Sequence, residues 1–303
     1  MLNFIYAVEM KVKRSRKLHS AVYIAGSYLI NAVYPAYLKI WMKFSKRRLD
    51  YKRGMIVSLT SFPARIHTTK VCVETIMKQT VRPEKIILWL AKEQFPDQKE
   101  VEAGFKEFIL KGLEIRYCDD LRSHKKYYYT MQEYPNAVVV TLDDDVFYPS
   151  YTLEYLLQEH QRNPECIIAN EAKVIGRDPE GNILPYNEWK SAREEWGEKT
   201  QAVCQIGVGG VLYPPHSLRK EVFNKDDIQN LAFHTDDLWL NAMARLKGAR
   251  SVCSKQFPTL FCIGNSQKKN LGAVNCGMNR NDIEMGLILK KYPDAFKKGE
   301  NHL

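Results

Sequence analysis

The stretch "NAVVVTLDDD" (residues 136–145) decides the fold, because an apolar run ends there in three consecutive carboxylates. Residues 137–141 have the β-branched character of a buried strand. Three adjacent carboxylates repel one another, so we expect a cation close to them. The cluster indicates either a solvated turn or a site for a divalent metal and a phosphate-bearing ligand, and its surroundings must distinguish the two.

The chain before this stretch alternates between short β-rich runs and helical patterns. Four strands are predicted at residues 54–62, 84–91, 113–118 and 136–142. Helices are predicted between them at residues 68–79, 99–112 and 123–134. This alternation predicts an α/β fold with a largely parallel sheet covered by helices, in which ligands bind beyond the carboxyl ends of the strands.

Polar segments follow three of these strands and are expected at one edge of the sheet. They are "TSFPAR" (60–65), "CDD" (118–120) and the three aspartates. Because side chains alternate along an extended segment, Asp143 and Asp145 are predicted to point to one side and Asp144 to the other. Two carboxylates on one side suit Mg²⁺ or Mn²⁺ bound to a diphosphate. Convergence of the three segments favours a ligand site over separate solvated turns.

The charge of the chain is concentrated at its N-terminus. The 303 residues include 45 Lys/Arg and 35 Asp/Glu, a formal net charge of +10. Residues 1–53 hold twelve of the basic residues against Glu9 and Asp50, which leaves 33 basic and 33 acidic residues beyond residue 53. A basic excess confined to one arm disfavours a nucleic-acid-binding protein. The composition, 45% hydrophobic and 26% charged, is that of a globular protein.

Residues 18–38 of this arm contain no Lys, Arg, Asp or Glu. The segment is about long enough to span a bilayer, but its polar residues and Pro35 suit the headgroup region better. We therefore expect an amphipathic arm, residues 1–53, that binds an anionic membrane surface and is not a removed signal peptide. A single span, or packing of the arm on the body or on a partner chain, are the alternatives. The seven scattered cysteines lack a C-x-x-C pair, which argues against a zinc knuckle or a disulfide framework.

Five segments, in this order, resemble bacterial GT-A-fold glycosyltransferases of the family 2 type, which assemble capsule or lipopolysaccharide glycans. They are "LTSFPAR", "TIMKQTVRPEKIILWLA", "HKKYYYTMQEYPNAVVVTLDDDVFYP", "IGVGGVLYPP" and "HTDDLWL". The resemblance implies a GT-A (Rossmann-like) α/β fold: a mixed, mainly parallel sheet flanked by helices, preceded by the basic N-terminal helical arm. The resemblance covers about residues 55–282. With the basic arm 1–53 before it, we expect a catalytic domain 54–265 with a nucleotide-sugar half 54–150 and an acceptor half 151–265, followed by a C-terminal loop and helix 266–303.

The resemblance also implies an activity. It is that of a metal-dependent, inverting hexosyltransferase with Mn²⁺ or Mg²⁺, which uses a nucleoside-diphosphate sugar, a UDP-sugar before others, and a glycan or lipid-linked glycan acceptor. The implied location is the cytoplasmic face of the inner membrane, as a peripheral or monotopic protein. A sugar-nucleotide nucleotidyltransferase and a non-catalytic glycan-binding protein are the alternatives.

The resemblance further implies the donor site. Its donor-binding residues would be Thr60, Ser61, Pro63, Arg65, Asp119, Asp120, Lys125, Lys126, Asp143, Asp144, Gly209 and Gly210. Asp143 and Asp145 would hold the metal and diphosphate, and Asp144 would face the ribose or a sugar hydroxyl. The two lysines would neutralise phosphate, or else form a solvated helix face.

The remaining implied roles concern the base and the acceptor. Asp236 or Asp237, with Asp237 preferred, would be the catalytic base, while acids at a helix start are also explained by the helix dipole. The expected acceptor contacts are Trp189, Tyr213 and Trp239, although tryptophan is commonly a core residue. Trp196 and the basic loop with Lys268 and Lys269 are further candidates for the acceptor wall and the diphosphate, respectively.

Overall fold

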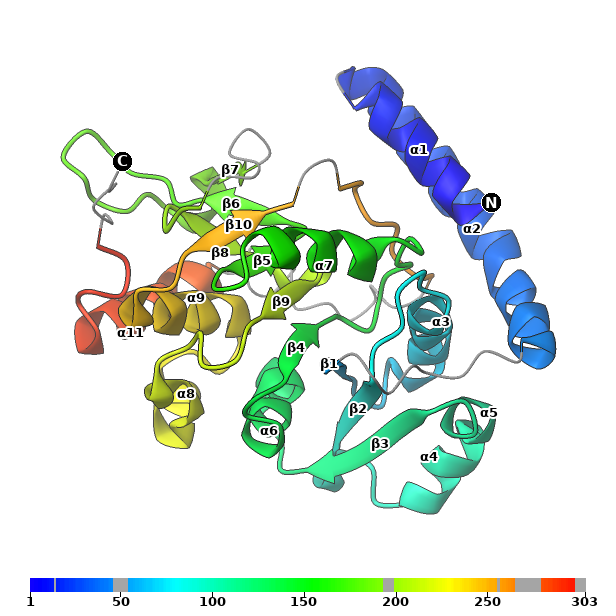
Figure 1. The fold of residues 1–303 in the computed structure, drawn as a ribbon. Helices are drawn as coiled ribbons and strands as arrows, with labels where there is room; N and C mark the ends of the chain where they lie inside the picture. Colours follow the sequence, from blue (N-terminus) through cyan, green and yellow to red (C-terminus); the bar gives the residue numbers. More distant parts are fainter. Residues whose placement is uncertain (14, 46–53, 193–198, 255–256, 265–278, 298–303) are drawn as a thin grey trace.

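The structure is a computed structural model that describes the chain except for residues 14, 46–53, 193–198, 255–256, 265–278 and 298–303. Within the described part, a central sheet has the strand order β10-β5-β9-β4-β1-β2-β3 (Figure 1). Its strands are β1 (Met55–Thr60), β2 (Lys85–Ala91), β3 (Leu113–Cys118), β4 (Val138–Thr141), β5 (Ile167–Ala169), β9 (Val211–Tyr213) and β10 (Ser251–Cys253). A small antiparallel sheet is formed by β6 (Ala172–Val174), β7 (Lys190–Ser191) and β8 (Val203–Gln205).

The central sheet is mixed and mainly parallel. Strands β1, β2, β3 and β4 pair in parallel, as do β5 and β10, whereas β9 runs antiparallel between β4 and β5. The four predicted strands form within two residues of their predicted bounds. The α/β fold class predicted from the sequence is therefore confirmed.

Helices cover both faces of the sheet. They are α3 (Ile66–Met77), α4 (Gln98–Gly104), α5 (Lys106–Ile109), α6 (Lys125–Glu133), α7 (Thr152–Arg162), α8 (Lys225–Leu231), α9 (Asp236–Lys247) and α11 (Arg280–Lys291). Alternation along the strands separates the faces: Val57 and Leu59 share a core with α3 and α7, while Ile56 packs on the α6 side. The single helix predicted at 99–112 is two helices that meet at the buried Phe105.

The N-terminal arm forms an antiparallel helical hairpin of α1 (Leu2–Val12) and α2 (Arg16–Phe44), seen beside α3 in Figure 1. One side of α2 buries Ile30, Tyr34, Leu38 and Met42, a spacing of four that keeps them on one helix face. These residues belong to the same core as α3 and β1. The arm therefore packs on the body, and among the described residues no helix combines the length and apolar character needed to cross a membrane.

Residues 257–263 join the arm to the segment after β4. The Tyr6 hydroxyl donates to the Phe147 carbonyl (2.5 Å) and accepts from the Phe261 N–H (3.1 Å). The Phe147 N–H in turn donates to the Phe261 carbonyl (2.9 Å), and the Ile263 N–H donates to the Asp145 carbonyl (2.8 Å). The arm is consequently hydrogen-bonded to the chain within a few residues of the aspartates.

Candidate active site

Two charged clusters lie at the carboxyl ends of β1 and β4. The first, which we call the closed cluster, consists of Ser61, Arg65, Thr69, Asp144 and Asp145. Asp144 accepts from the Ser61 hydroxyl (2.5 Å), the Thr69 hydroxyl (3.2 Å) and Arg65 Nη1 (2.9 Å). The same Arg65 nitrogen is 3.1 Å from Asp145 Oδ2. All five side chains belong to buried residues. One guanidinium pairs with both carboxylates, and burial still raises the pKa of Asp144 against the opposing effects of Arg65 and Ser61.

The second, the open cluster, consists of Lys126, Asp143, Asp236, Asp237 and Gly207. Lys126 Nζ is 2.7 Å from Asp143 Oδ1 and 2.9 Å from Asp236 Oδ2. The Gly207 N–H lies 3.0 Å and 3.1 Å from the two carboxylate oxygens of Asp237. Here three carboxylates surround one ammonium, and the side chain of Asp143 is 32% exposed.

Helix termini position the open cluster. Lys126 lies in the first turn of α6, and Asp236 and Asp237 open α9, where carboxylates complement the helix dipole. Thr235, the residue before α9, makes no side-chain cap; its hydroxyl donates instead to Glu284 of α11 (2.7 Å). Glu284 also accepts from the His234 N–H, so α11 fixes the start of α9.

The electrostatics of the open cluster are unbalanced. Burial and the adjacent Asp236 raise the pKa of Asp237 to about 8, against the opposing effect of Lys126. Burial acts against charge on Asp236 as well, but Lys126 and His124 hold the pKa of Asp236 below its usual value. Burial would lower the pKa of Lys126, yet Asp143 and Asp236 raise it well above its usual value. Lys126 therefore stays charged, and Asp237 is the group of the cluster that can exchange a proton near neutral pH.

Gly207 is a site residue that the sequence analysis did not single out. A Cβ at this position would lie 2.9 Å from Asp237 Oδ1, 3.0 Å from Lys126 Nζ and 3.7 Å from Asp143 Oδ1. The expected donor glycines have packing roles: a Cβ at Gly209 would meet Glu171, and Gly210, at a φ of +90°, packs on Leu142. The glycine-rich motif indicated a close backbone approach, but only the fold shows that Gly207 is the glycine facing Asp237 and Lys126.

The predicted division of the three aspartates is wrong. Asp144 and Asp145 share Arg65, whereas Asp143 turns to Lys126. Strand β4 ends at Thr141, so the alternation of an extended strand no longer applies to residues 143–145. Tyr148 shapes the turn, because its hydroxyl accepts from the Asp143 N–H (2.9 Å) and donates to the Val208 carbonyl (3.0 Å).

The carboxylates offer a limited fit to a divalent metal. Within the described residues, no three His, Cys, Asp or Glu side chains gather closely enough to hold a metal ion. Asp143 is the most exposed of the three adjacent aspartates, and its oxygens are hard donors of the kind that Mg²⁺ and Mn²⁺ prefer. These carboxylates suit a divalent ion that takes most of its other ligands from phosphate oxygens and water.

The other expected donor residues line the same rim at its edges. Thr60 donates its hydroxyl to the Trp89 carbonyl (2.8 Å), and Pro63 is exposed in the turn before α3. Lys125 pairs with Asp120 (2.5 Å) rather than with the open cluster. Asp119 is exposed and 3.0 Å from Lys225. Of the two adjacent lysines, Lys126 is thus the one brought to the aspartates.

The expected acceptor contacts need correction. Trp189, Tyr213 and Trp239 are 4%, 3% and 0% exposed, and the two indole N–H groups donate to the Leu184 and Val222 carbonyls. Their rings pack in the core on the α6 and α9 side of the sheet, so they cannot contact an acceptor. Trp196, Lys268 and Lys269 lie outside the described residues.

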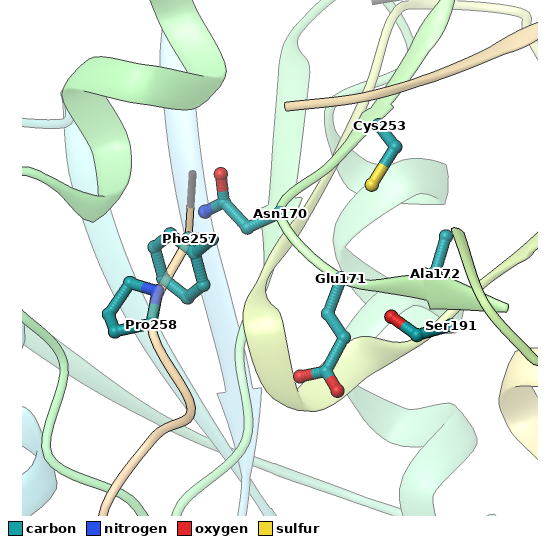
Figure 2. Close-up of a pocket in the computed structure, with 7 residues that line it drawn as sticks. All are labelled: Asn170, Glu171, Ala172, Ser191, Cys253, Phe257 and Pro258. Carbon is teal, nitrogen blue, oxygen red and sulfur yellow. The ribbon is translucent and has the colours of Figure 1, made fainter. Parts of the chain in front are cut away.

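A small hollow lies near the turn of residues 207–210, where Glu171 approaches Gly209. Figure 2 shows Glu171 pointing into it between Phe257 and Pro258 on one side and Ser191 on the other. The hollow is lined by Asn170, Glu171, Ala172, Ser191, Cys253, Phe257 and Pro258. Asn170 connects it to the turn through a hydrogen bond to the Gly209 carbonyl (3.0 Å).

Comparison with known proteins gives similarity at the level of structure. No protein-family model matches the sequence, and no curated protein matches it. A mannosyltransferase, PcManGT from Pyrobaculum calidifontis, in complex with GDP-Man and Mn²⁺, is 13% identical with a TM-score of 0.49, over 97% of this chain and 76% of that chain. S. aureus TarS 1–349 in complex with UDP-GlcNAc is 10% identical with a TM-score of 0.47, over 72% of this chain and 60% of that chain. At these identities and TM-scores, neither structure supports a conclusion about this chain.

Proposed function

We propose that this protein is a glycosyltransferase of the GT-A type. It would move a hexose from a nucleoside-diphosphate sugar, preferably a UDP-sugar, to a hydroxyl of a glycan or lipid-linked glycan, with inversion of the anomeric configuration. The observation that carries the proposal is the open cluster. There a half-buried carboxylate with a raised pKa, Asp237, lies beside a buried, charged Lys126 and an accessible Asp143 at the carboxyl rim of the sheet.

Asp237 has the properties of a general base. It would accept the proton of the acceptor hydroxyl while that oxygen bonds to the anomeric carbon and the bond from that carbon to the diphosphate breaks. A base works best when its pKa lies near the working pH, and a pKa of about 8 would let Asp237 take up a proton near neutral pH. The Gly207 N–H orients this carboxylate, and direct displacement at the anomeric carbon inverts its configuration.

Asp236 supports Lys126 instead. Its ion pair with Lys126 and its lowered pKa keep Asp236 ionised and occupied, so it is the weaker candidate for the base. Lys126 supplies positive charge beside Asp143, where the diphosphate would depart, and such fixed charge stabilises a developing anion without reorganisation.

A divalent ion would complement this arrangement. We propose that Asp143 would hold Mn²⁺ or Mg²⁺. Asp145, the other expected metal residue, is paired with Arg65 instead. When bound, the ion would neutralise the diphosphate leaving group.

A donor screen tests the proposal. The purified full chain is incubated with UDP-, GDP- and CMP-sugars, with and without Mn²⁺, and release of the nucleotide is measured together with donor binding. We expect turnover of one donor that is lost in Asp237→Asn and kept in Asp226→Asn, an exposed carboxylate on α8. Failure to bind or turn over any donor would rule out the transferase. Release of pyrophosphate from a nucleoside triphosphate and a sugar phosphate would indicate a nucleotidyltransferase.

A further inference from the structure

The outward side of α2 is an apolar surface without a covering element among the described residues. Its exposed residues between the flanking charges are Leu18, Ser20, Ala21, Ile24, Ala25, Tyr28, Leu29, Ala32, Val33, Ala36 and Tyr37, which we call the outer face. Tyr28 is 77% exposed and Ile24 57%. Of the fourteen large hydrophobic side chains exposed in the described part of the chain, nine lie in the two helices of the hairpin. Single exposed apolar residues are ordinary, but a continuous face of this length marks an interaction surface.

Charge is arranged around this face with one sign. The exposed residues Arg16 and Lys17 precede it, and the exposed Lys39 and Lys43 follow it. The hairpin has a single acidic residue, Glu9, which is fully buried and hydrogen-bonded to His19 (2.5 Å). The surface that the hairpin presents to solvent is therefore apolar along its middle and positive at both ends.

We propose that the outer face of α2 is a docking surface for an anionic lipid bilayer, with the helix lying in the plane of the interface. An apolar stripe bounded by lysine and arginine matches acyl chains beneath a negatively charged headgroup layer. The stripe covers about 20 residues, roughly 30 Å of helix, which gives an extended line of contact. This inference concerns a different surface from the open cluster and does not depend on the proposed function.

The opposite side of α2 rules out immersion of the whole helix. Asn31 donates to the Cys262 carbonyl (3.0 Å), the Tyr23 hydroxyl donates to the Leu260 carbonyl (3.1 Å), and Ile30 and Tyr34 are buried against the body. Only the outer face is available to lipid, so the helix lies on the bilayer and does not cross it.

A second copy of the chain is a poorer occupant. Two outer faces packed together in either direction would bring Arg16 and Lys17 close to basic residues of the other copy. The hairpin exposes no carboxylate in its described residues that could offset this repulsion. Anionic lipid supplies the missing negative charge.

The location of the outer face gives it a consequence for substrates. Tyr6 and Asn3 of the hairpin bond to Phe147 and Ser150, just beyond the three aspartates. A bilayer on the outer face would thus lie on the flank of the molecule next to the rim that carries both charged clusters. Under the proposed function, which this consequence alone requires, a lipid-linked acceptor held in that bilayer would be presented near the rim.

The test is co-sedimentation of the full chain with vesicles of phosphatidylcholine alone or with a quarter of phosphatidylglycerol. We expect binding to the anionic vesicles that weakens with salt. The variant Ile24→Gln/Leu29→Gln/Val33→Gln should bind at least roughly tenfold more weakly, because three apolar side chains of the outer face lose their burial in lipid. Its matched control, Leu110→Gln/Ile283→Gln/Leu287→Gln, removes the same number of exposed apolar side chains elsewhere and should bind as the parent does.

A charge variant separates the electrostatic part. Arg16→Gln/Lys17→Gln/Lys39→Gln/Lys43→Gln should lose affinity for the anionic vesicles by roughly fivefold per charge, whereas Lys99→Gln/Lys106→Gln/Lys220→Gln/Lys247→Gln should not. All these positions are exposed, and thermal unfolding checks that each variant is folded. Unchanged binding of the triple apolar variant, or equal binding to neutral vesicles, would overturn the proposal. So would a dimer in light scattering that the triple variant abolishes.

Discussion

The closed and open clusters lie side by side on one rim and share three consecutive aspartates, but they treat charge differently. In the closed cluster, Arg65 and the hydroxyl groups of Ser61 and Thr69 donate hydrogen bonds to the buried Asp144. In the open cluster, one ammonium serves Asp143 and Asp236, and Asp237 relies on a backbone N–H. The first arrangement holds a turn in place, and the second leaves a carboxylate able to take or give a proton.

The largest expected effect is the loss of the base in Asp237→Asn. We expect kcat to fall by about 10² to 10⁴-fold, the usual contribution of a general base. The variant should also be more stable than the parent. Since the folded protein raises the pKa of Asp237, ionised Asp237 opposes folding increasingly as pH rises toward 8. Thermal unfolding at pH 5 and pH 9 should show a gain that is larger at pH 9, and equal gains would contradict the raised pKa.

The closed cluster should show the opposite behaviour in Arg65→Met. Removing a buried cation leaves Asp144 and Asp145 uncompensated, which costs about 3–5 kcal/mol of unfolding free energy. Urea unfolding measures this loss. Arg162→Met is the matched control, because the Arg162 guanidinium is solvent-exposed and its pair with the half-buried Glu159 contributes about 1 kcal/mol or less. A loss in Arg65→Met no larger than in this control would show that the closed cluster does not stabilise the turn.

The spacing of the open cluster can be changed through Gly207→Ala. The added methyl would lie within 3.0 Å of both Asp237 and Lys126, so one of them must shift. We expect roughly a tenfold to hundredfold loss in kcat, with donor binding affected less. Gly286→Ala, at a helix position with open space, controls for a change of glycine alone. Turnover equal to that of the parent would mean that the Asp237–Lys126 geometry is not critical.

The smallest effect is a shift of the pH profile. In the parent, kcat/KM should rise with pH as Asp237 loses its proton near pH 8. The negative charge of Asp236 raises the pKa of Asp237, so Asp236→Asn should move the rising limb to lower pH. The pH dependence of kcat/KM in the two proteins measures the shift. A profile that does not move would favour a base other than Asp237.

The sequence predicts the frame of this protein well and its side-chain contacts less well. Hydrophobic periodicity places β1 to β4 and their rim, because burial imposes a regular pattern. The pairing of Asp144 with Arg65 depends on a bend beyond β4 and on Tyr148, which no periodicity records. Strand β9 has only three residues, too few for a recognisable pattern, and it is inserted by the tertiary fold. The acceptor prediction failed because large aromatic residues are commonly buried in cores, and the sequence does not show which of them face a ligand.

The hydrogen bonds of Tyr6 determine how this protein can be shortened for laboratory work. A chain that begins at Met55 would lose the hydroxyl that serves both the Phe147 carbonyl and the Phe261 N–H. It would also expose the core side chains that now cover Ile30, Tyr34 and Leu38. A buried polar group left without a partner costs about 1–3 kcal/mol. A loss of lipid binding in such a shortened chain could come from unfolding alone. Expression designs should therefore retain the hairpin and alter only its outward side chains.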